Sequence, residues 1–212
     1  GTIGAARLRG QDRTPRPLTT PAIVFVGGLH PRKGLDDLFA AFAIVHARNP
    51  AARLHIVGDG PLRPDYVAAV ARSTCADAVS FAGGQDNPYP WMAGADIFVL
   101  PSHADPAPLV LSEAREAGCA IVATRVDGIP ELLEQGRAGL LVPPRDPAAL
   151  AETLISLIEE PDTLRLWKER SQVGIERMRI ERVAKETLAV YAAARGERAP
   201  GTTPVPAEPG QC

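Results

Sequence analysis

The sequence predicts an α/β domain built on a doubly wound parallel sheet. Short apolar runs alternate with amphipathic segments along most of the chain, and most of these runs end at glycine or proline. A run that is apolar throughout is typical of a strand buried on both faces, as strands of parallel sheets are. Repeated β-α units of this kind, joined by right-handed crossovers, build one sheet around one core.

The first two β-α units show this pattern. Residues 22–26 (AIVFV) are all apolar, and two glycines end this expected strand. A helix is expected just after Lys33, because apolar side chains three and four positions apart form one face there, at Leu35, Leu38, Phe39 and Phe42. A second strand is expected over residues 53–57, closed by Gly-Asp-Gly, and a second helix over residues 63–73.

The remaining elements follow the same rhythm. Strands are expected at residues 79–82, 97–100, 120–123 and 138–142, the last at an edge. Short apolar helical patterns predict helices at residues 90–95, 109–117 and 129–134. Asp146 is expected to cap a helix whose apolar face holds Leu150, Leu154, Leu157 and Ile158. A final helix is defined by Ile180, Val183, Ala184, Thr187, Leu188 and Tyr191.

Composition limits the classes of function. The chain has 212 residues, 45% of them hydrophobic, and a net charge of −2, which does not favour nucleic acid as a partner. Its three cysteines form no disulfide framework or zinc spacing, and no apolar run approaches the roughly 20 residues of a membrane span. We therefore expect a reducing, cytoplasmic setting and no metal site.

The two ends differ from the middle. Residues 1–21 and 196–212 are rich in proline and are expected to be a disordered linker and a disordered tail. Residues 22–195 are then a single domain. The chain also starts without methionine, so we expect it to be a fragment of a longer protein.

Three segments could carry chemistry at the carboxyl ends of strands, where parallel sheets bind ligands. One runs from Leu100 to Thr124 and holds two carboxylates, Asp105 and Glu113, which can accept hydrogen bonds from sugar or ribose hydroxyls. The second is GGLHPRKG, residues 27–34, where glycines, a helix start and Lys33 suit a phosphate. The third is DGIPE, residues 127–131, a further helix start.

Each segment also has a purely structural interpretation: a helix cap, a glycine turn or a solvated charge pair. Of the four histidines, His30 and His103 fall in loops at the expected ligand edge, while His46 and His55 fall inside elements and are expected to be structural. No histidine has the spacing of a metal ligand.

Taken together, the sequence resembles the C-terminal, donor-binding domain of the retaining GT-B glycosyltransferases of family 4 (glycosyl transferases group 1). The matching segments occur in family order and cover nearly everything from Ala22 to Ala194; they are FVGGLHPRKGLDDLFAAFA, LHIVGDGPLR, VSFAGGQDNPYPWMAGADIFVLPS and ADPAPLVLSEAREAGCAIVATRVDGIPELLEQGRAGLLVPPRDPAAL. The resemblance implies a Rossmann-like domain that forms one half of a GT-B fold.

The resemblance also implies roles for individual residues. Lys33 stands where the family contacts the donor diphosphate, Glu113 where it binds the ribose, and Asp105 where the first acid of a Glu-x7-Glu motif reaches the transferred sugar. Catalysis would then depend on Asp105 and Lys33, and donor binding would involve further positions at the strand ends and at the loop before residues 109–117: Gly27, Gly28, Gly84, Gln85, Pro108, Leu109 and Val110.

The implied function is retaining transfer of a hexosyl group from a UDP- or GDP-sugar, with no cofactor or metal beyond the donor substrate. The acceptor, a sugar, lipid or polysaccharide, would be bound by an N-terminal domain that this chain does not contain, so the isolated chain should not turn over. Polysaccharide or glycolipid synthesis implies a cytoplasmic protein, with peripheral contact to the inner membrane face left open.

Two departures from the family pattern support an alternative. Gly28 stands where the family usually has arginine, and Asp105 is one methylene shorter than the usual glutamate. The alternative is a catalytically degenerate subunit that binds nucleotide-sugars or a partner; a related epimerase or phosphorylase is a third hypothesis. Arg32 could replace the missing guanidinium, but its place in the sequence predicts that it points elsewhere.

Overall fold

The computed structural model describes residues 12–175, 187–191 and 194–195. The chain divides into two units, residues 1–175 and 176–212, of which the first carries all the strands among the described residues. In the second unit, residues 187–191 are helical, as predicted for Thr187, Leu188 and Tyr191. The other positions of that predicted final helix, Ile180, Val183 and Ala184, lie outside the described residues, as does the predicted tail.

A six-stranded sheet forms the centre of the first unit. The strands are β1 (Ala22–Val26), β2 (Arg53–Val57), β3 (Val79–Gly83), β4 (Ile97–Leu100), β5 (Ala120–Thr124) and β6 (Leu140–Val142). Their order is β3-β2-β1-β4-β5-β6 and every neighbouring pair is parallel. All residues of β1, β4 and β5 are buried, which explains why these strands are continuous apolar runs. The predicted doubly wound, Rossmann-like sheet is confirmed.

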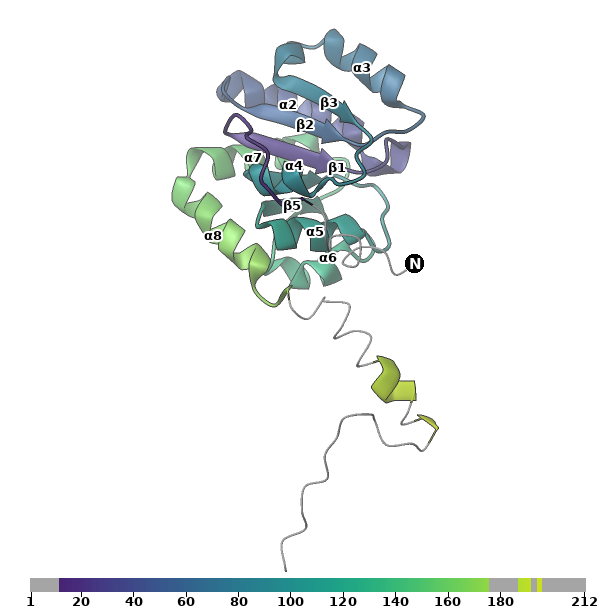
Figure 1. Ribbon diagram of the computed structural model, residues 1–212. Helices are drawn as coiled ribbons and strands as arrows, with labels where there is room; N and C mark the ends of the chain where they lie inside the picture. The colour runs from purple at the N-terminus through teal and green to yellow at the C-terminus, as the bar shows by residue number, and fades with distance from the viewer. Residues whose placement is uncertain (1–11, 176–186, 192–193, 196–212) are drawn as a thin grey trace, which may run out of the picture. The chain divides into compact units, whose positions relative to one another are not determined.

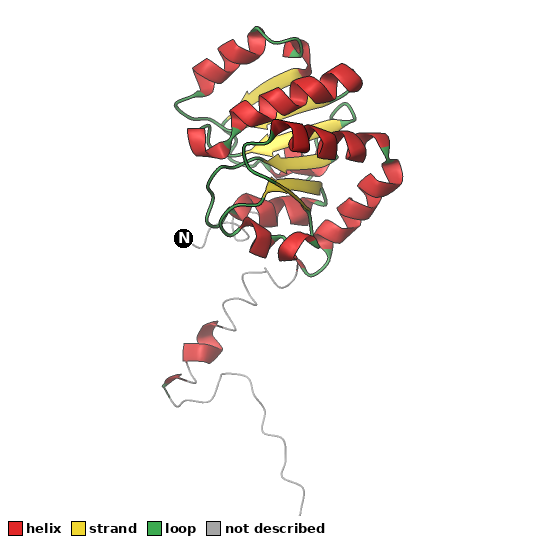
Figure 2. Cartoon of the chain, turned by 180° about the vertical axis from the view of Figure 1, so that it is seen from behind, coloured by secondary structure: helices red, strands yellow, loops and turns green. Residues whose placement is uncertain are grey.

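Helices cover both faces of this sheet (Figures 1 and 2). On one face α2 packs against α7 and α3, and on the other α4 packs against α5. The helices are α2 (Leu35–Arg48), α3 (Arg63–Ala71), α4 (Tyr89–Gly94), α5 (Leu109–Ala117), α6 (Ile129–Leu132), α7 (Pro147–Glu159) and α8 (Pro161–Gln172), with 3-10 turns η1 (Pro31–Lys33), η2 (Ala76–Ala78) and η3 (Glu134–Gly136). Within the described residues, no helix combines the length and apolar character needed to cross a bilayer.

The predicted elements agree with these bounds to within a few residues. Asp146 caps α7 as expected, because its Oδ1 accepts a hydrogen bond from the backbone N–H of Ala149 at 2.9 Å. Two segments differ from the prediction. The last strand is shorter than expected, and the helix expected over residues 129–134 ends at Leu132 and is followed by η3, inside which Gln135 has a left-handed φ of 59°.

Helix α8 has no counterpart among the predicted elements. It packs at the amino ends of the central strands, where Lys168 Nζ lies 2.8 Å from Asp96 Oδ1 and Asp96 Oδ2 accepts from Ala22 N at 3.0 Å. Arg115 ties α5 to the end of α8: its guanidinium is fully buried and donates to the carbonyls of Ser171 and Val173 at 2.8 and 2.7 Å. These contacts anchor the amino edge of the sheet, opposite to the carboxyl edge at which parallel sheets generally bind ligands.

Part of the segment expected to be a disordered linker contacts the domain. Residues 12–18 lie along α4: the Arg13 guanidinium lies 4.2 Å from the centre of the Tyr89 ring, and that of Arg16 lies 4.1 Å from the centre of Trp91. Arg16 N also donates to Pro90 O at 2.9 Å. These arginines gain cation–π and ion-pair partners that are not apparent in a proline-rich sequence taken by itself.

Candidate functional site at the carboxyl edge of the sheet

The predicted site residues cluster where the strand order reverses. The connection from β1 leads to β2 on one side, and the connection from β4 leads to β5 on the other, although β1 and β4 are neighbours. At such a switch point two loops diverge and leave a crevice beyond the carboxyl ends of the strands. The loop after β1 carries Lys33 and the loop after β4 carries Asp105, so the sequence-distant candidates meet here.

Lys33 is held in place by the tight turn η1. Gly34 follows it with a left-handed φ of 66°, and α2 begins at the next residue. A Cβ on Gly34 would lie 2.0 Å from Pro101 O, so this position brings the loops after β1 and β4 into backbone contact. The loops are also joined by hydrogen bonds from His103 N and Ala104 N to Arg32 O, at 2.7 and 3.4 Å.

The central contact is an ion pair between the two expected catalytic residues. Lys33 Nζ lies 2.5 Å from Asp105 Oδ2, and the two side chains are only 10% and 7% exposed. Ser102 Oγ donates to the same carboxylate oxygen at 3.3 Å. Because little water reaches either group, each charge depends on the other for its stabilisation. Lys33 is therefore not the solvated surface cation that the structural interpretation of this segment would make it.

Arg32 also faces Asp105, which corrects the prediction that it points elsewhere. Its Nη1 lies 3.6 Å from Asp105 Oδ1 and donates to Ala104 O at 3.2 Å. The contacts of the turn explain the difference, because the backbone of Arg32 is hydrogen-bonded to the loop after β4 and its side chain reaches Ala104 O in that loop. Arg32 is half exposed and Lys33 is buried, so one cation faces solvent and the other faces the protein.

The third candidate segment supports the acid-bearing loop. Asp127 accepts a hydrogen bond from Asp105 N at 2.6 Å, and Asp127 itself has a φ of 44°. Thr124 Oγ1 donates to Ser102 O at 2.5 Å. Asp127, the first residue of the segment 127–131, thus uses its side chain to hold the backbone of Asp105 in place. The spacing of the motif did not predict this role.

The loop between Asp105 and Glu113 ends at the start of α5. Pro108 is the N-cap, its side chain is buried, and no side chain caps the first turn of the helix. Leu109 is 51% exposed, Val110 is half-buried, and Glu113 is half-buried in the second turn. The amino end of a helix carries partial positive charge, so this start is suited to an anion.

The glycines after β1 are packed differently from each other. Gly27 O would lie 1.9 Å from a Cβ on Gly58, so the loops after β1 and β2 touch through their backbones at this point. At Gly28 the nearest neighbour is a side chain: a Cβ there would lie 3.0 Å from His30 Cδ2. The imidazole of His30 thus lies next to the position where the resembled family usually has arginine.

Gly84 and Gln85 lie at the end of β3, two strands away from β1. A Cβ on Gly84 would be 3.7 Å from Asp59 Cβ, so the loops after β2 and β3 are side by side. Gln85 Nε2 donates to Ala82 O at 3.0 Å. The structure therefore brings Lys33 and Asp105 into contact and places these two residues farther along the same edge.

The histidines follow the predicted division. His46 lies in α2 and His55 in β2, where burial lowers the pKa of the His55 imidazole and Arg16 and Arg53 lower it further. His30 and His103 lie in loops of the candidate site, and His103 Nε2 is 2.6 Å from Asp37 Oδ2. Sequence spacing did not predict the Asp37–His103 pair, because its members lie 66 residues apart.

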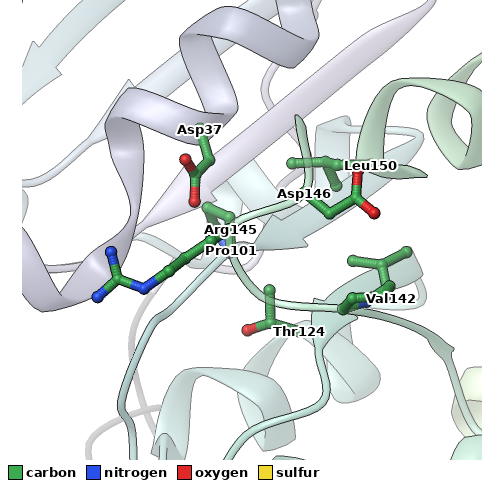
Figure 3. Close-up of a pocket in the computed structure, with 8 residues that line it drawn as sticks. Asp37, Pro101, Thr124, Val142, Arg145, Asp146 and Leu150 are labelled. Carbon is green, nitrogen blue, oxygen red and sulfur yellow. The ribbon is translucent and has the colours of Figure 1, made fainter. Parts of the chain in front are cut away.

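A shallow pocket lies next to this pair, between the start of α2, the ends of the strands and the loop before α7 (Figure 3). Its lining residues are Asp37, Pro101, Thr124, Val142, Pro143, Arg145, Asp146 and Leu150. Lys33, Asp105 and Glu113 are not among them, so this pocket lies beside the Lys33–Asp105 pair and does not include it.

Known proteins share this sequence pattern and fold. The family described as glycosyl transferases group 1 matches residues 20–160. A glycogen synthase of Mycobacterium tuberculosis (strain CDC 1551 / Oshkosh) is 33% identical over 206 residues, which cover 93% of this chain and 49% of that protein. A D-inositol 3-phosphate glycosyltransferase of Streptomyces scabiei is 31% identical over 202 residues, covering 90% of this chain and 45% of that protein.

A solved structure shares the fold of this chain. Anabaena Alr3699/HepE, crystallised in complex with UDP, superposes with a TM-score of 0.71 at 26% identity, over 83% of this chain and 49% of that one. The chain spans about half the length of the curated relatives named above. The predicted family resemblance is confirmed: the chain belongs to the glycosyl transferases group 1 family.

Proposed function

We propose that this chain is the donor-binding half of a glycosyltransferase, and that it binds a UDP- or GDP-sugar for retaining transfer of a hexosyl group. The observation that carries the proposal is the cationic turn Arg32–Lys33 beside Asp105 at the switch point of the sheet. An acceptor-binding domain would supply the second wall of the cleft and bind the sugar, lipid or polysaccharide acceptor.

The chemistry required of this half is stabilisation of the leaving nucleoside diphosphate. Arg32, Lys33 and the amino end of α5 offer positive charge to a diphosphate, and such preorganised charge is worth most in a site that excludes water. Glu113 is proposed to accept hydrogen bonds from the ribose hydroxyls, and Gly84 and Gln85 to lie along the nucleobase. These groups supply the charge that a metal ion would otherwise provide, so the proposal includes no cofactor.

The experiment is calorimetric titration of the chain with UDP, GDP and ADP at low salt. We expect one nucleotide to bind in the micromolar to millimolar range. Lys33→Ala should weaken it about a hundredfold, since it removes the buried cation of the site. Glu113→Ala should weaken nucleotide binding but leave the binding of inorganic pyrophosphate unchanged, because pyrophosphate has no ribose.

Matched controls separate these effects from lost stability. Lys168→Ala removes a lysine that is also paired with an aspartate, but at the opposite edge of the sheet, and Glu116→Ala removes a second glutamate of α5. Both controls should bind nucleotide like the parent chain. If Lys33→Ala binds as the parent does, or if no nucleotide binds to the folded chain, the proposed donor site is wrong.

The alternative of a degenerate binding subunit is favoured by one observation, the imidazole of His30 beside Gly28. Gly28 has ordinary backbone angles, and only the end of a flexible side chain opposes a Cβ there, so an arginine can be built in. We expect Gly28→Arg to tighten UDP binding about tenfold, because a guanidinium makes charge-assisted hydrogen bonds to a diphosphate. Titration of Gly28→Arg against Gly28→Met, which adds length without charge, measures this. Equal affinities for the two variants would contradict the idea that Gly28 marks a weakened site.

A further inference from the structure

Asp105 has partners that a sugar-binding acid would not need. Its Oδ2 accepts from Lys33 Nζ at 2.5 Å and from Ser102 Oγ at 3.3 Å, and its Oδ1 faces Arg32 Nη1 at 3.6 Å. Both oxygens are thus directed at groups of the protein. The side chain is 7% exposed, which leaves little of it for a ligand's hydroxyls.

The carboxylate of Asp105 compensates part of the positive charge of this cluster. Two cations, Arg32 and Lys33, face its two oxygens. A diphosphate that approaches these cations carries negative charge of its own. It must therefore compete with Asp105 for Lys33, because both anions seek the same ammonium group.

We infer that Asp105 is a built-in counter-ion of the diphosphate site: it holds Lys33 and Arg32 in the unliganded chain and is displaced from Lys33 when an anion binds. The inference rests on the proposed function and assigns Asp105 a positioning role in that site. It also explains why an aspartate is long enough here. Backbone hydrogen bonds already tie the loop of Asp105 to η1, so its short side chain reaches Lys33.

The backbone around Asp105 suits such an exchange. Asp105 N is fixed to Asp127 Oδ2 at 2.6 Å, and Ser102 O is fixed to Thr124 Oγ1 at 2.5 Å. The carboxylate can therefore change partners while the loop that carries it stays in place. Ser102 Oγ remains as a neutral donor to Asp105 after Lys33 leaves.

The test is Asp105→Asn, which keeps the size of the side chain and removes its charge. The counter-ion role predicts two effects of opposite sign. The melting temperature of the unliganded chain falls by several degrees, because a buried ammonium loses its charged partner. Affinity for pyrophosphate and for UDP rises about tenfold at low salt, because the competing anion is gone, and the gain shrinks as salt is added.

A merely structural Asp105 would lower both stability and affinity, and a sugar-binding Asp105 would leave pyrophosphate affinity unchanged; either result overturns the inference. Asp96→Asn is the matched control, because Asp96 also pairs with a lysine but at the amino edge of the sheet. It should lower the melting temperature without changing pyrophosphate affinity. Adding Lys33→Ala to Asp105→Asn should abolish the gain, as in a double-mutant cycle.

A second measurement uses the unaltered chain, so that it does not depend on a variant folding. The carboxyl 13C resonance of Asp105 should shift as pyrophosphate is added, in step with binding. A resonance that stays constant through saturation overturns the inference.

Failure of the proposed function gives a different result from failure of this inference. If pyrophosphate binds more tightly to Asp105→Asn but no nucleotide binds to either chain, the donor-site proposal fails and the counter-ion assignment stands.

Discussion

Replacement of Arg115 by alanine is expected to lower the free energy of unfolding by about 3–5 kcal/mol. The guanidinium is fully buried and donates to Ser171 O, Leu132 O and Val173 O, and it pairs with Glu134 Oε1 at 2.9 Å. Its removal leaves several buried acceptors without their donor and a cavity the length of the side chain. The measurement is urea unfolding of the variant and the parent chain. The two free energies of unfolding are compared with the same m value, the slope of the free energy against urea concentration.

The control is Arg165→Ala, because Arg165 also pairs with a carboxylate but is 70% exposed. That variant should differ from the parent by no more than about 0.5 kcal/mol. A loss below about 1 kcal/mol for Arg115→Ala would contradict the argument, since it would mean that the carbonyls at the end of α8 find other donors.

Gly34→Ala is expected to abolish nucleotide binding and to cost several kcal/mol of stability together. The added Cβ would lie 2.0 Å from Pro101 O, a backbone atom that cannot move aside as a flexible side chain can. The turn that carries Lys33 must then separate from the loop that carries Asp105. Calorimetry with UDP and urea unfolding of the same preparation measure the two effects.

Gly136→Ala isolates the conformational part of this cost. Gly136 also has a left-handed φ, 91°, but the nearest atom to its added Cβ is a leucine methyl carbon at 3.8 Å. Its substitution should cost about 1–2 kcal/mol, the ordinary price of a left-handed residue with a side chain, and leave nucleotide binding intact. If both variants lose the same stability and both still bind UDP, close contact at Gly34 does not hold the site together.

The sheet could be predicted from the sequence because its strands are continuous apolar runs. β1, β4 and β5 are buried along their whole length, so burial and sequence carry the same information. Helix α8 could not be predicted in this way. Its packing rests on Trp167, Leu164 and the polar Lys168, while Leu166 is 43% exposed, so no single apolar stripe marks the segment.

The residue types of the site could be predicted, but not their contacts. Lys33 and Asp105 were expected at the ligand edge, yet they lie 72 residues apart and only the parallel order of β1 and β4 brings them together. Arg32 was predicted to point away because sequence alone does not specify a 3-10 turn. Arg115 looks like an ordinary surface charge on α5 until α8 covers it.

The parallel sheet also separates the candidate site residues from the residues that anchor α8, because the two groups lie at opposite edges. Lys33 and Asp105 lie at one edge, and the anchors Arg115 and Lys168 lie at the other. Substitutions in the loops at the carboxyl edge therefore leave the anchors untouched. Over evolutionary time such a scaffold can exchange its ligand-facing loops at little risk to folding, and a protein engineer could use the same freedom to transplant loops from one relative to another.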